Sequence, residues 1–299
     1  MDKNIHADGE GDGGSDQTQQ AEQGLKRRAL VVSGIFYPDD PEILAAELAS
    51  WGLKKGSEGQ ISGGQVILAP HGAWDLTGAL AASAFASVQG KGGDTGKPIS
   101  RVLLLGASHH SNEENICLSD SVSFETPLGD LSVSQKLNRE LASCSTLIRV
   151  NDIPHLTEHS LEVLLPMVKY CFPSAKIIPI LMAGARPMLI SILAKALYIV
   201  FEKYMQETLI LISSNISHSK DPALAKSMAD DFNDILEKME SKALVDGIAR
   251  GRISACGGAL VATLLESGLL DGKNFSSLCP YVKGIGESDE TVYYGAYGV

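Results

Sequence analysis

Basic residues are scarce in this sequence. Its 299 residues include 25 Lys and Arg against 36 Asp and Glu, which gives a formal net charge of −11. Proteins that bind a phosphate backbone carry clustered Lys and Arg, so this charge balance argues against nucleic acid as a partner. The one basic cluster, Lys26–Arg28, is short and is expected to be a solvated flank.

A disulfide framework and a membrane-spanning segment are also missing. The five cysteines form an odd set without CxxC spacing, which is typical of reduced thiols. The N-terminus lacks the apolar segment that a secretory signal needs. The longest apolar stretch, residues 187–201, is interrupted by Ser191 and Lys195 and is shorter than the ~20 residues that span a bilayer. We therefore expect a cytoplasmic protein that does not enter a membrane.

Several motifs of common enzyme classes are absent. No GxGxxG follows an expected strand, so a dinucleotide site has no support, and no GxSxG marks a serine hydrolase. Residues 91–98 (KGGDTGKP) resemble a phosphate-binding loop only superficially. They precede an expected strand, and Pro98 stands where such a loop has the Ser or Thr that binds Mg²⁺.

The apolar pattern that is present is typical of an α/β protein. Runs of Val, Ile and Leu predict strands that are buried on both faces of a mainly parallel or mixed sheet. Helical patterns between them predict a central sheet flanked by helices in a single domain over 28–299. Residues 1–27, which are rich in Gly, Asp and Gln, are expected to be a disordered tail. Strands are expected at 65–69, 101–105, 115–119, 122–125, 176–182, 209–212 and 292–297; helices at 39–51, 77–88, 134–141, 160–170, 188–205, 221–241, 243–250 and 256–265; and loops at 54–64, 89–98 and 155–159.

Three histidines each come shortly after one of these buried strands. They are His71, His109 and His218. Because ligands bind outside the carboxyl ends of parallel strands, we expect the three imidazoles to converge on one edge of the sheet. Two His and an anionic ligand make up the facial set of non-haem Fe(II) sites, and Cys256 at an expected helix N-terminus could supply the anion as a thiolate. Each of these residues alone would also fit a structural role, as a hydrogen-bonded histidine or a small buried cysteine.

Other histidines have less specific positions. His110 and His155 are expected to be exposed or to structure a loop. The segment Glu158–Glu162 (EHSLE) fits a helix N-terminus, but its Glu-His pair could also orient a site or donate protons to it.

Read in order, several segments resemble the Memo family, also called AmmeMemoRadiSam system protein B. The resemblance spans residues 34–257, and its specificity comes from the order of the segments. The matching segments are GIFYP (34–38), LAPHGAWDLTG (68–78), LLLGASHH (103–110), TPLG (126–129), EHSLEVLLP (158–166), IIPILMAG (177–184), LISSNISH (211–218) and Cys256-Gly257.

This resemblance implies a fold and a metal site. The fold would be a single α/β domain similar to class III extradiol dioxygenases, which bind Fe(II) with two His and a carboxylate. The equivalent site of Memo-like proteins, two His and a Cys, maps onto His71, His109 and Cys256. Fe(II) is the expected metal, with Cu or Zn as alternatives.

The resemblance also implies three catalytic residues. His218 matches a site histidine that would act as a general acid/base, while Glu158 and His159 match the family's EHS motif at the pocket rim. Two positions depart from the family pattern. The usual HAGY appears as HGAW (71–74), and the usual SSD-x-SH has Asn215 in the place of Asp. A neutral amide can hydrogen-bond but cannot act as a base or compensate the charge of a metal.

Three functions are compatible with these features. The first is a redox or oxygen-dependent metalloenzyme that acts on a small-molecule substrate. The second is a non-enzymatic binding module, since Memo-like proteins are linked with phosphorylated peptides and the same pocket could hold the anion of a phosphopeptide. The third is a partner protein of a radical-SAM system, as the family's compound name suggests. This chain has no Fe–S cysteine motif of its own.

Overall fold

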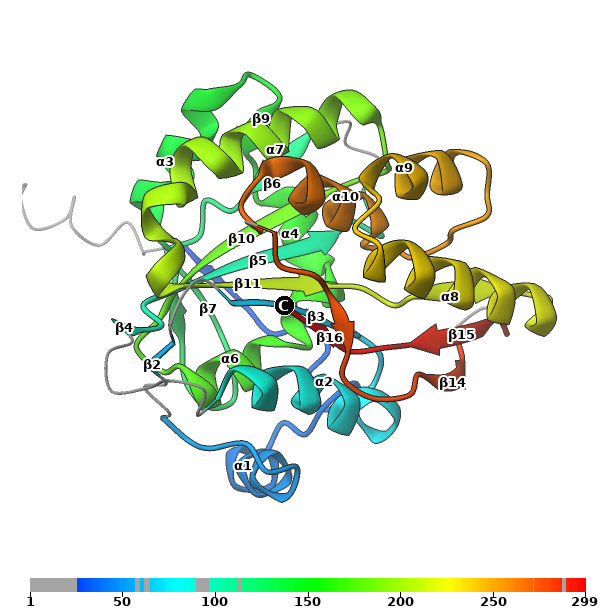
Figure 1. Cartoon of the computed structure of the whole chain (residues 1–299). Helices are drawn as coiled ribbons and strands as arrows, with labels where there is room; N and C mark the ends of the chain where they lie inside the picture. The colour runs from blue at the N-terminus through cyan, green and yellow to red at the C-terminus, as the bar shows by residue number, and fades with distance from the viewer. Residues whose placement is uncertain are drawn as a thin grey trace, which may run out of the picture.

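Four runs of Val, Ile and Leu form the middle of one large sheet. The computed structural model describes residues 26–56, 60–61, 65–89, 97–111, 115–270, 272–286 and 289–299. In it, an eight-stranded sheet has the order β13-β16-β3-β11-β5-β10-β6-β9 (Figure 1). The four central strands run parallel, so their carboxyl ends meet at one edge. The strands are β3 (Gln65–Ala69), β5 (Arg101–Ala107), β6 (Ile116–Leu118), β9 (Ile148–Val150), β10 (Lys176–Met182), β11 (Thr208–Ser213), β13 (Ser276–Ser277) and β16 (Tyr297–Gly298).

Alternate residues of these strands enter two separate cores, one on each face of the sheet. Ile67 and Leu209 belong to one core, whereas Val66 and Ile210 belong to the other. Both faces are therefore covered by helices, as a strand made only of apolar residues requires. One face carries α1 (Pro41–Ser50), α2 (Trp74–Val88) and α6 (Leu165–Cys171); the other carries α3 (Gln135–Cys144), α7 (Pro187–Phe201), α8 (Pro222–Glu237), α9 (Ser241–Ala249) and α10 (Gly258–Ser267) (Figure 1). The expected α/β class, with a mixed sheet flanked by helices in one domain, is confirmed.

The helix starts marked by Asp-Pro pairs are confirmed, and one expected helix is broken. Asp40 and Asp221 cap α1 and α8, and each side chain accepts hydrogen bonds from backbone N–H groups of the first turn. The helix expected over 160–170 is instead divided into α5 (His159–Glu162) and α6. Pro166 in the first turn of α6 lacks an N–H donor and its ring crowds the preceding turn, so a continuous helix is excluded there. The helix expected to reach residue 205 ends at Phe201, and a 3₁₀ helix, η1 (Glu202–Glu207), follows.

Short elements account for the other differences from expectation. The loop expected at 155–159 is mostly helical, because α4 (Ile153–Thr157) covers its first three residues and α5 begins at its last. The strand expected over 292–297 is two strands in different sheets, β15 (Thr291–Tyr294) and β16. β15 pairs on either side with β12 (Ser217–Ser219) and β14 (Val282–Ile285), which the apolar pattern did not predict. A further small sheet joins β1 (Arg27–Arg28), β7 (Ser123–Phe124) and β8 (Leu131–Ser132), and another joins β2 (Gln60–Ile61) and β4 (Lys97–Pro98).

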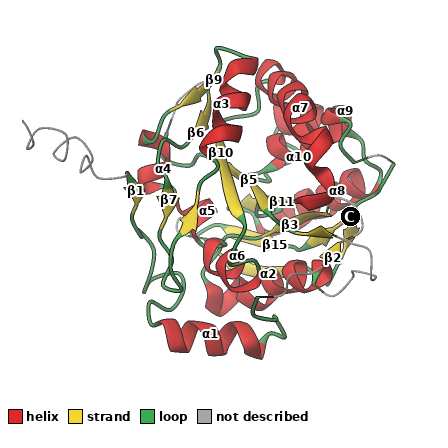
Figure 2. Ribbon diagram, turned by 90° about the vertical axis from the view of Figure 1, so that its left-hand side faces the viewer, coloured by secondary structure: helices red, strands yellow, loops and turns green. Residues whose placement is uncertain are grey.

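The first described residues pack against the domain. Most of the tail expected over 1–27 lies outside the described residues, but Arg27 belongs to β1, which lies beside β7 and near α4 (Figure 2). The expectation of a solvated basic flank is wrong for Arg28, whose side chain is only 2% exposed. The polar loops expected at 54–64 and 89–98 lie partly outside the described residues. Among the helices that the structure describes, none combines the length and apolar character needed to cross a bilayer.

Candidate metal centre

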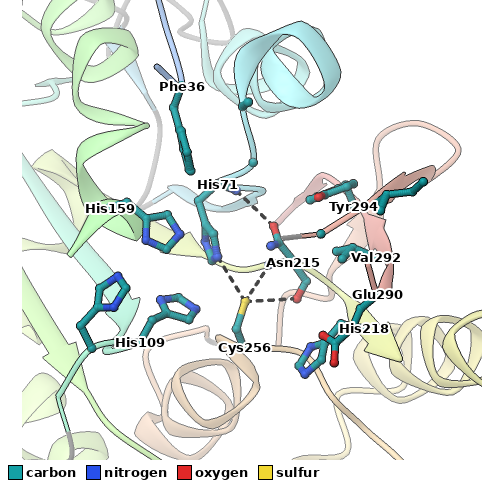
Figure 3. Close-up of a pocket in the computed structure, with 15 residues that line it drawn as sticks. Phe36, His71, His109, His159, Asn215, His218, Cys256, Glu290, Val292 and Tyr294 are labelled. Atoms are coloured by element: carbon teal, nitrogen blue, oxygen red, sulfur yellow. Dashed lines mark hydrogen bonds between the residues drawn. The ribbon is translucent and has the colours of Figure 1, made fainter. Parts of the chain in front are cut away.

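The edge where the parallel strands end brings two imidazoles and a thiol together. His71 follows β3, His109 follows β5, and Cys256 lies just before α10. Each offers one ligand atom, and these three atoms lie within 4.8 Å of one another (Figure 3). The His71 Nε2 and Cys256 Sγ atoms are 3.4 Å apart. Ligands at the usual metal–nitrogen and metal–sulfur distances stand about 3.5 Å apart in a tetrahedral site, so this pair fits a shared ion.

A serine on β11 determines which ring nitrogen of His71 is available. Nδ1 of His71 lies 2.8 Å from Oγ of Ser213, and that hydroxyl donates its only proton to the carbonyl of Ser160 at 2.6 Å. The hydroxyl must therefore accept from His71, so Nδ1 carries a proton and cannot serve as a metal ligand. Nε2 is the nitrogen that faces Cys256 and would offer its lone pair to a metal ion there. This arrangement is typical of metal-ligating histidines, whose other nitrogen donates to a fixed acceptor.

A buried carboxylate orients His109 in the same way. Glu158 accepts from the His109 backbone N–H at 2.6 Å and from its ring Nδ1 at 2.8 Å, so Nε2 is the nitrogen left for a ligand role. The carboxylate also caps α5 by accepting from the backbone N–H of Ser160 at 3.0 Å. Burial alone would raise the pKa of Glu158, but its bonds to His109 and Ser160 lower that pKa to about 2. Glu158 is therefore ionised and holds the His109 ring from behind.

Cys256 is stabilised as a thiolate by its neighbours. Burial alone would raise the pKa of its thiol, but the His71 and His109 imidazoles lower that pKa well below its ordinary value of 9.0. The sulfur also accepts from the backbone N–H of Asn215 at 3.1 Å. Gly257 lets this segment approach β11 closely, because a Cβ there would lie 2.8 Å from the Ser213 carbonyl oxygen.

When no metal is bound, a protonated His109 ring balances the negative charge of this thiolate. Burial by itself would lower the pKa of His109, but the Cys256 sulfur and the Glu158 carboxylate together raise it to about 10. A metal ion at this point would take the place of the ring proton, because only the neutral imidazole has a lone pair to offer.

His159 lies next to both imidazole ligands. Its ring centroid is 5.5 Å from that of His71 and 5.0 Å from that of His109, and Phe36 packs against it edge-on at 5.4 Å. Burial and the neighbouring His71 lower the pKa of His159 to about 3, so the ring is neutral. His109, Glu158 and His159 could also surround an ion, but N–H donors already occupy the Glu158 oxygens. We therefore interpret this second group as the hydrogen-bonded support of the first.

A cavity of about 520 Å³ opens in front of these residues. His218 lies on the far wall from His159, on β12, with its side chain exposed (Figure 3). The cavity thus brings together His71, His109, His159, His218, Cys256 and Asn215, whereas Glu158 stands behind His109. Residues that sequence reasoning missed complete the walls: Phe36, Gly72, Ala73, Ile285, Gly286, Glu290, Val292 and Tyr294.

Alternation along β15 could have identified part of this wall. Glu290, Val292 and Tyr294 are two residues apart, and Val292 pairs with His218 across the strands, so these side chains share one face. Asn215, which stands in the place of the family's Asp, accepts from the His71 backbone N–H at 3.3 Å through its side-chain oxygen. The amide therefore helps to hold the chain that carries His71.

The two histidines expected to be exposed or to structure a loop differ from each other. His110 is exposed and lines the cavity. His155 is buried in α4, outside the cavity, where Nε2 donates to the Cys117 carbonyl at 3.1 Å. Burial lowers the pKa of His155 to about 4. Of the two expected roles, His155 therefore has the structural one, although it lies in a short helix and not in a loop.

Acid should destabilise the metal-free protein through His155. The unfolded chain takes up a proton at this residue near pH 6.5, whereas the folded chain does so only near pH 4, so its contribution is lost as the pH falls between these values. The shift corresponds to a loss on the order of 3 kcal/mol in the free energy of unfolding. Urea unfolding between pH 7 and 4.5 should show a shallower pH dependence for His155→Gln than for the unchanged protein. An equally shallow curve for His110→Gln, whose ring is exposed, would contradict this assignment.

Comparisons with known proteins identify the family of this chain. A family model described as Memo-like protein matches residues 28–295. A MEMO1 family protein of Desulfurococcus amylolyticus is 29% identical over 253 residues, which are 81% of this chain and 87% of that protein. One of Thermotoga neapolitana is 27% identical over 250 residues, 81% of this chain and 88% of that protein. The crystal structure of an uncharacterized protein from Escherichia coli K12 is 13% identical with a TM-score of 0.47 and covers 79% of this chain and 99% of that one. Because the family model matches most of the length of this chain, the chain belongs to the Memo-like protein family.

Proposed function

We propose that this protein is a mononuclear metalloenzyme with His71, His109 and Cys256 as its metal ligands. The observation that carries the proposal is the orientation of the two rings. Each Nδ1 is held by an acceptor, Ser213 for His71 and Glu158 for His109, so that both Nε2 atoms are left for a centre beside the Cys256 sulfur. A purely structural pair of histidines would not need both second nitrogens directed at one thiolate.

The donor set favours a first-row transition metal. Imidazole suits Fe, Cu and Zn, while a thiolate favours softer ions, so hard oxygen-seeking cations such as Mg²⁺ are a poor fit. We propose Fe(II), with Cu or Zn as the alternatives. A bound Fe(II) would supply one-electron chemistry towards a small oxidant such as oxygen, which makes the proposed reaction class an oxidoreductase of dioxygenase-like type.

The other cavity residues would bind and protonate a substrate. The volume of about 520 Å³ is in the range of small-molecule sites. His159, which is neutral and next to both ligands, can hydrogen-bond to a polar group of the substrate, and His218 on the opposite wall can deliver a proton from solvent. Phe36, Val292 and Tyr294 would cover the apolar part of the substrate and exclude water from it.

Elemental analysis of protein purified without oxygen tests the proposal directly. We expect about one equivalent of transition metal per chain, with iron as the main element. Protein that carries no such metal, and takes up none when it is reconstituted with Fe(II), Cu(I) or Zn(II), would refute it.

A phosphopeptide is a second candidate ligand for the same cavity. The specific observation in its favour is that the imidazoles of His110 and His218 are exposed at the cavity and can donate to an anion. Titration of the metal-free protein with a phosphotyrosine peptide should then give saturable binding, which the unphosphorylated peptide does not give. If neither peptide binds, the metalloenzyme proposal stands alone.

A further inference from the structure

Arg28 is a buried guanidinium whose hydrogen bonds reach the segment behind the metal centre. Its Nε donates to the carbonyl of His155 at 3.0 Å, and its Nη2 donates to the carbonyl of Glu158 at 2.8 Å. Its Nη1 pairs with the carboxylate of Glu162, whose side chain is fully buried. One side chain thus holds the main chain of α4 at His155 and the main chain of Glu158, the residue that links α4 to α5.

Glu162 ties a second segment to the same point. Its carboxylate accepts from the backbone N–H groups of Val31 and Val32, both at 2.9 Å, and from the hydroxyl of Tyr37 at 2.8 Å. These residues flank the turn that carries Phe36, and Phe36 packs against His159 in the cavity. The ion pair therefore anchors both the loop that supports His109 and the turn that forms a cavity wall.

We propose that Arg28 and Glu162 are positioning residues that set the Glu158 carboxylate against His109. This inference rests on the proposed metal site. Arg28 holds the carbonyl of Glu158, and the carboxylate of that same residue holds both the backbone N–H and the ring Nδ1 of His109. A shift of the Glu158 main chain would turn the His109 ring and move its Nε2 away from the Cys256 sulfur.

The packing around this segment leaves it little room to adjust on its own. A Cβ at Gly106, near the end of β5, would lie 2.3 Å from the Leu161 side chain and 3.0 Å from that of Ser160. Ser160 and Leu161 therefore pack directly against β5, the strand that leads to His109. Because this region is closely packed, a small shift of the main chain after the loss of Arg28 would also displace His109.

Asp152 offers a matched control in the same region. Its side chain is also a buried carboxylate, but it bonds to Ser119 at 2.6 Å, to Ser121 at 2.9 Å and to Lys26 at 2.8 Å. In the described part of the chain, the hydrogen bonds and the ion pair of this carboxylate go to residues 26 and 119–121 and not to the segment 158–162. Its loss should lower stability without turning His109.

The test is a titration with Co(II), whose absorption reports both affinity and thiolate ligation. Arg28→Lys keeps a positive charge for Glu162 but lacks the forked guanidinium whose separate nitrogens reach Glu162 and both carbonyls, and Glu162→Gln removes the negative charge of the pair. We expect each variant to weaken Co(II) binding about tenfold, as is usual when a partner behind a ligand is lost. Asp152→Asn should bind within about twofold of the unchanged protein although its melting temperature falls as well. If the first two variants do not fold, Tyr37→Phe, which removes one bond to Glu162, should give a smaller weakening.

A double-mutant cycle separates positioning from general destabilisation. If Arg28 acts through Glu158, Arg28→Lys should weaken Co(II) binding in the unchanged protein but have almost no further effect in a Glu158→Gln background. An equal effect in both backgrounds, or equal weakening by Asp152→Asn, would overturn the inference and leave the metal site standing. Failure of the unchanged protein to bind Co(II) would instead refute the proposed function.

Discussion

Replacing Cys256 or His71 by alanine should abolish metal loading of the protein. Cys256 supplies the only anionic ligand of the proposed set, and without it two neutral imidazoles would have to hold a divalent cation. Removal of His71 leaves the thiolate with a single imidazole partner in the site. We expect the metal content to fall from about one equivalent per chain to near zero in both variants. Elemental analysis after purification without oxygen measures this effect.

His218→Ala is the matched control for these two variants. His218 lines the same cavity, but its side chain is exposed on the opposite wall and is not one of the three residues that share the site. The metal content of this variant should therefore equal that of the unchanged protein, while turnover of a substrate should fall if His218 moves a proton. Metal retained in both Cys256→Ala and His71→Ala would place the ion elsewhere. Metal lost in all three variants would indicate damage to the fold.

The convergence of the ligands could be predicted because it follows from sheet topology. His71 and His109 each follow a buried parallel strand, and parallel strands end at a common edge whatever the connections between them. Cys256 was placed by its position at the start of an expected helix and by the family resemblance. Asp40 and Asp221 marked helix starts through local bonds that depend on neighbouring residues only.

The partners of these ligands could not be predicted in the same way. The Glu158 carboxylate reaches His109 across 49 residues of sequence, and Ser213 reaches His71 across 142. Neither contact leaves a periodic signal, since each depends on where two loops pack. Arg28 differs in the opposite direction. A cationic residue is expected at the surface, but a buried carboxylate and two main-chain carbonyls far along the chain pair with its charge and its N–H donors.

The stability of the fold should depend strongly on this buried ion pair. Arg28→Met leaves the Glu162 carboxylate without its counter-ion, and breaking a buried pair by removing one partner costs about 3–5 kcal/mol of unfolding free energy. The cost comes from the uncompensated charge more than from the lost attraction. Urea unfolding of the metal-free protein at pH 7 should show this loss. Lys26→Met removes a half-exposed cation and should lose much less.

A second substitution should therefore restore stability instead of adding to the damage. Arg28→Met combined with Glu162→Gln removes both charges, and the amide oxygen can still accept from Val31 and Val32. We expect the double variant to regain about half of the lost unfolding free energy, the remainder reflecting the carbonyls of His155 and Glu158 that lose their donor. Losses that simply add would show that Arg28 stabilises the fold by packing and not by pairing. Because the carbonyl of Glu158 stays without its donor, the double variant should regain stability without regaining metal affinity. This result would separate the contribution of Arg28 to the stability of the fold from its effect on the orientation of His109.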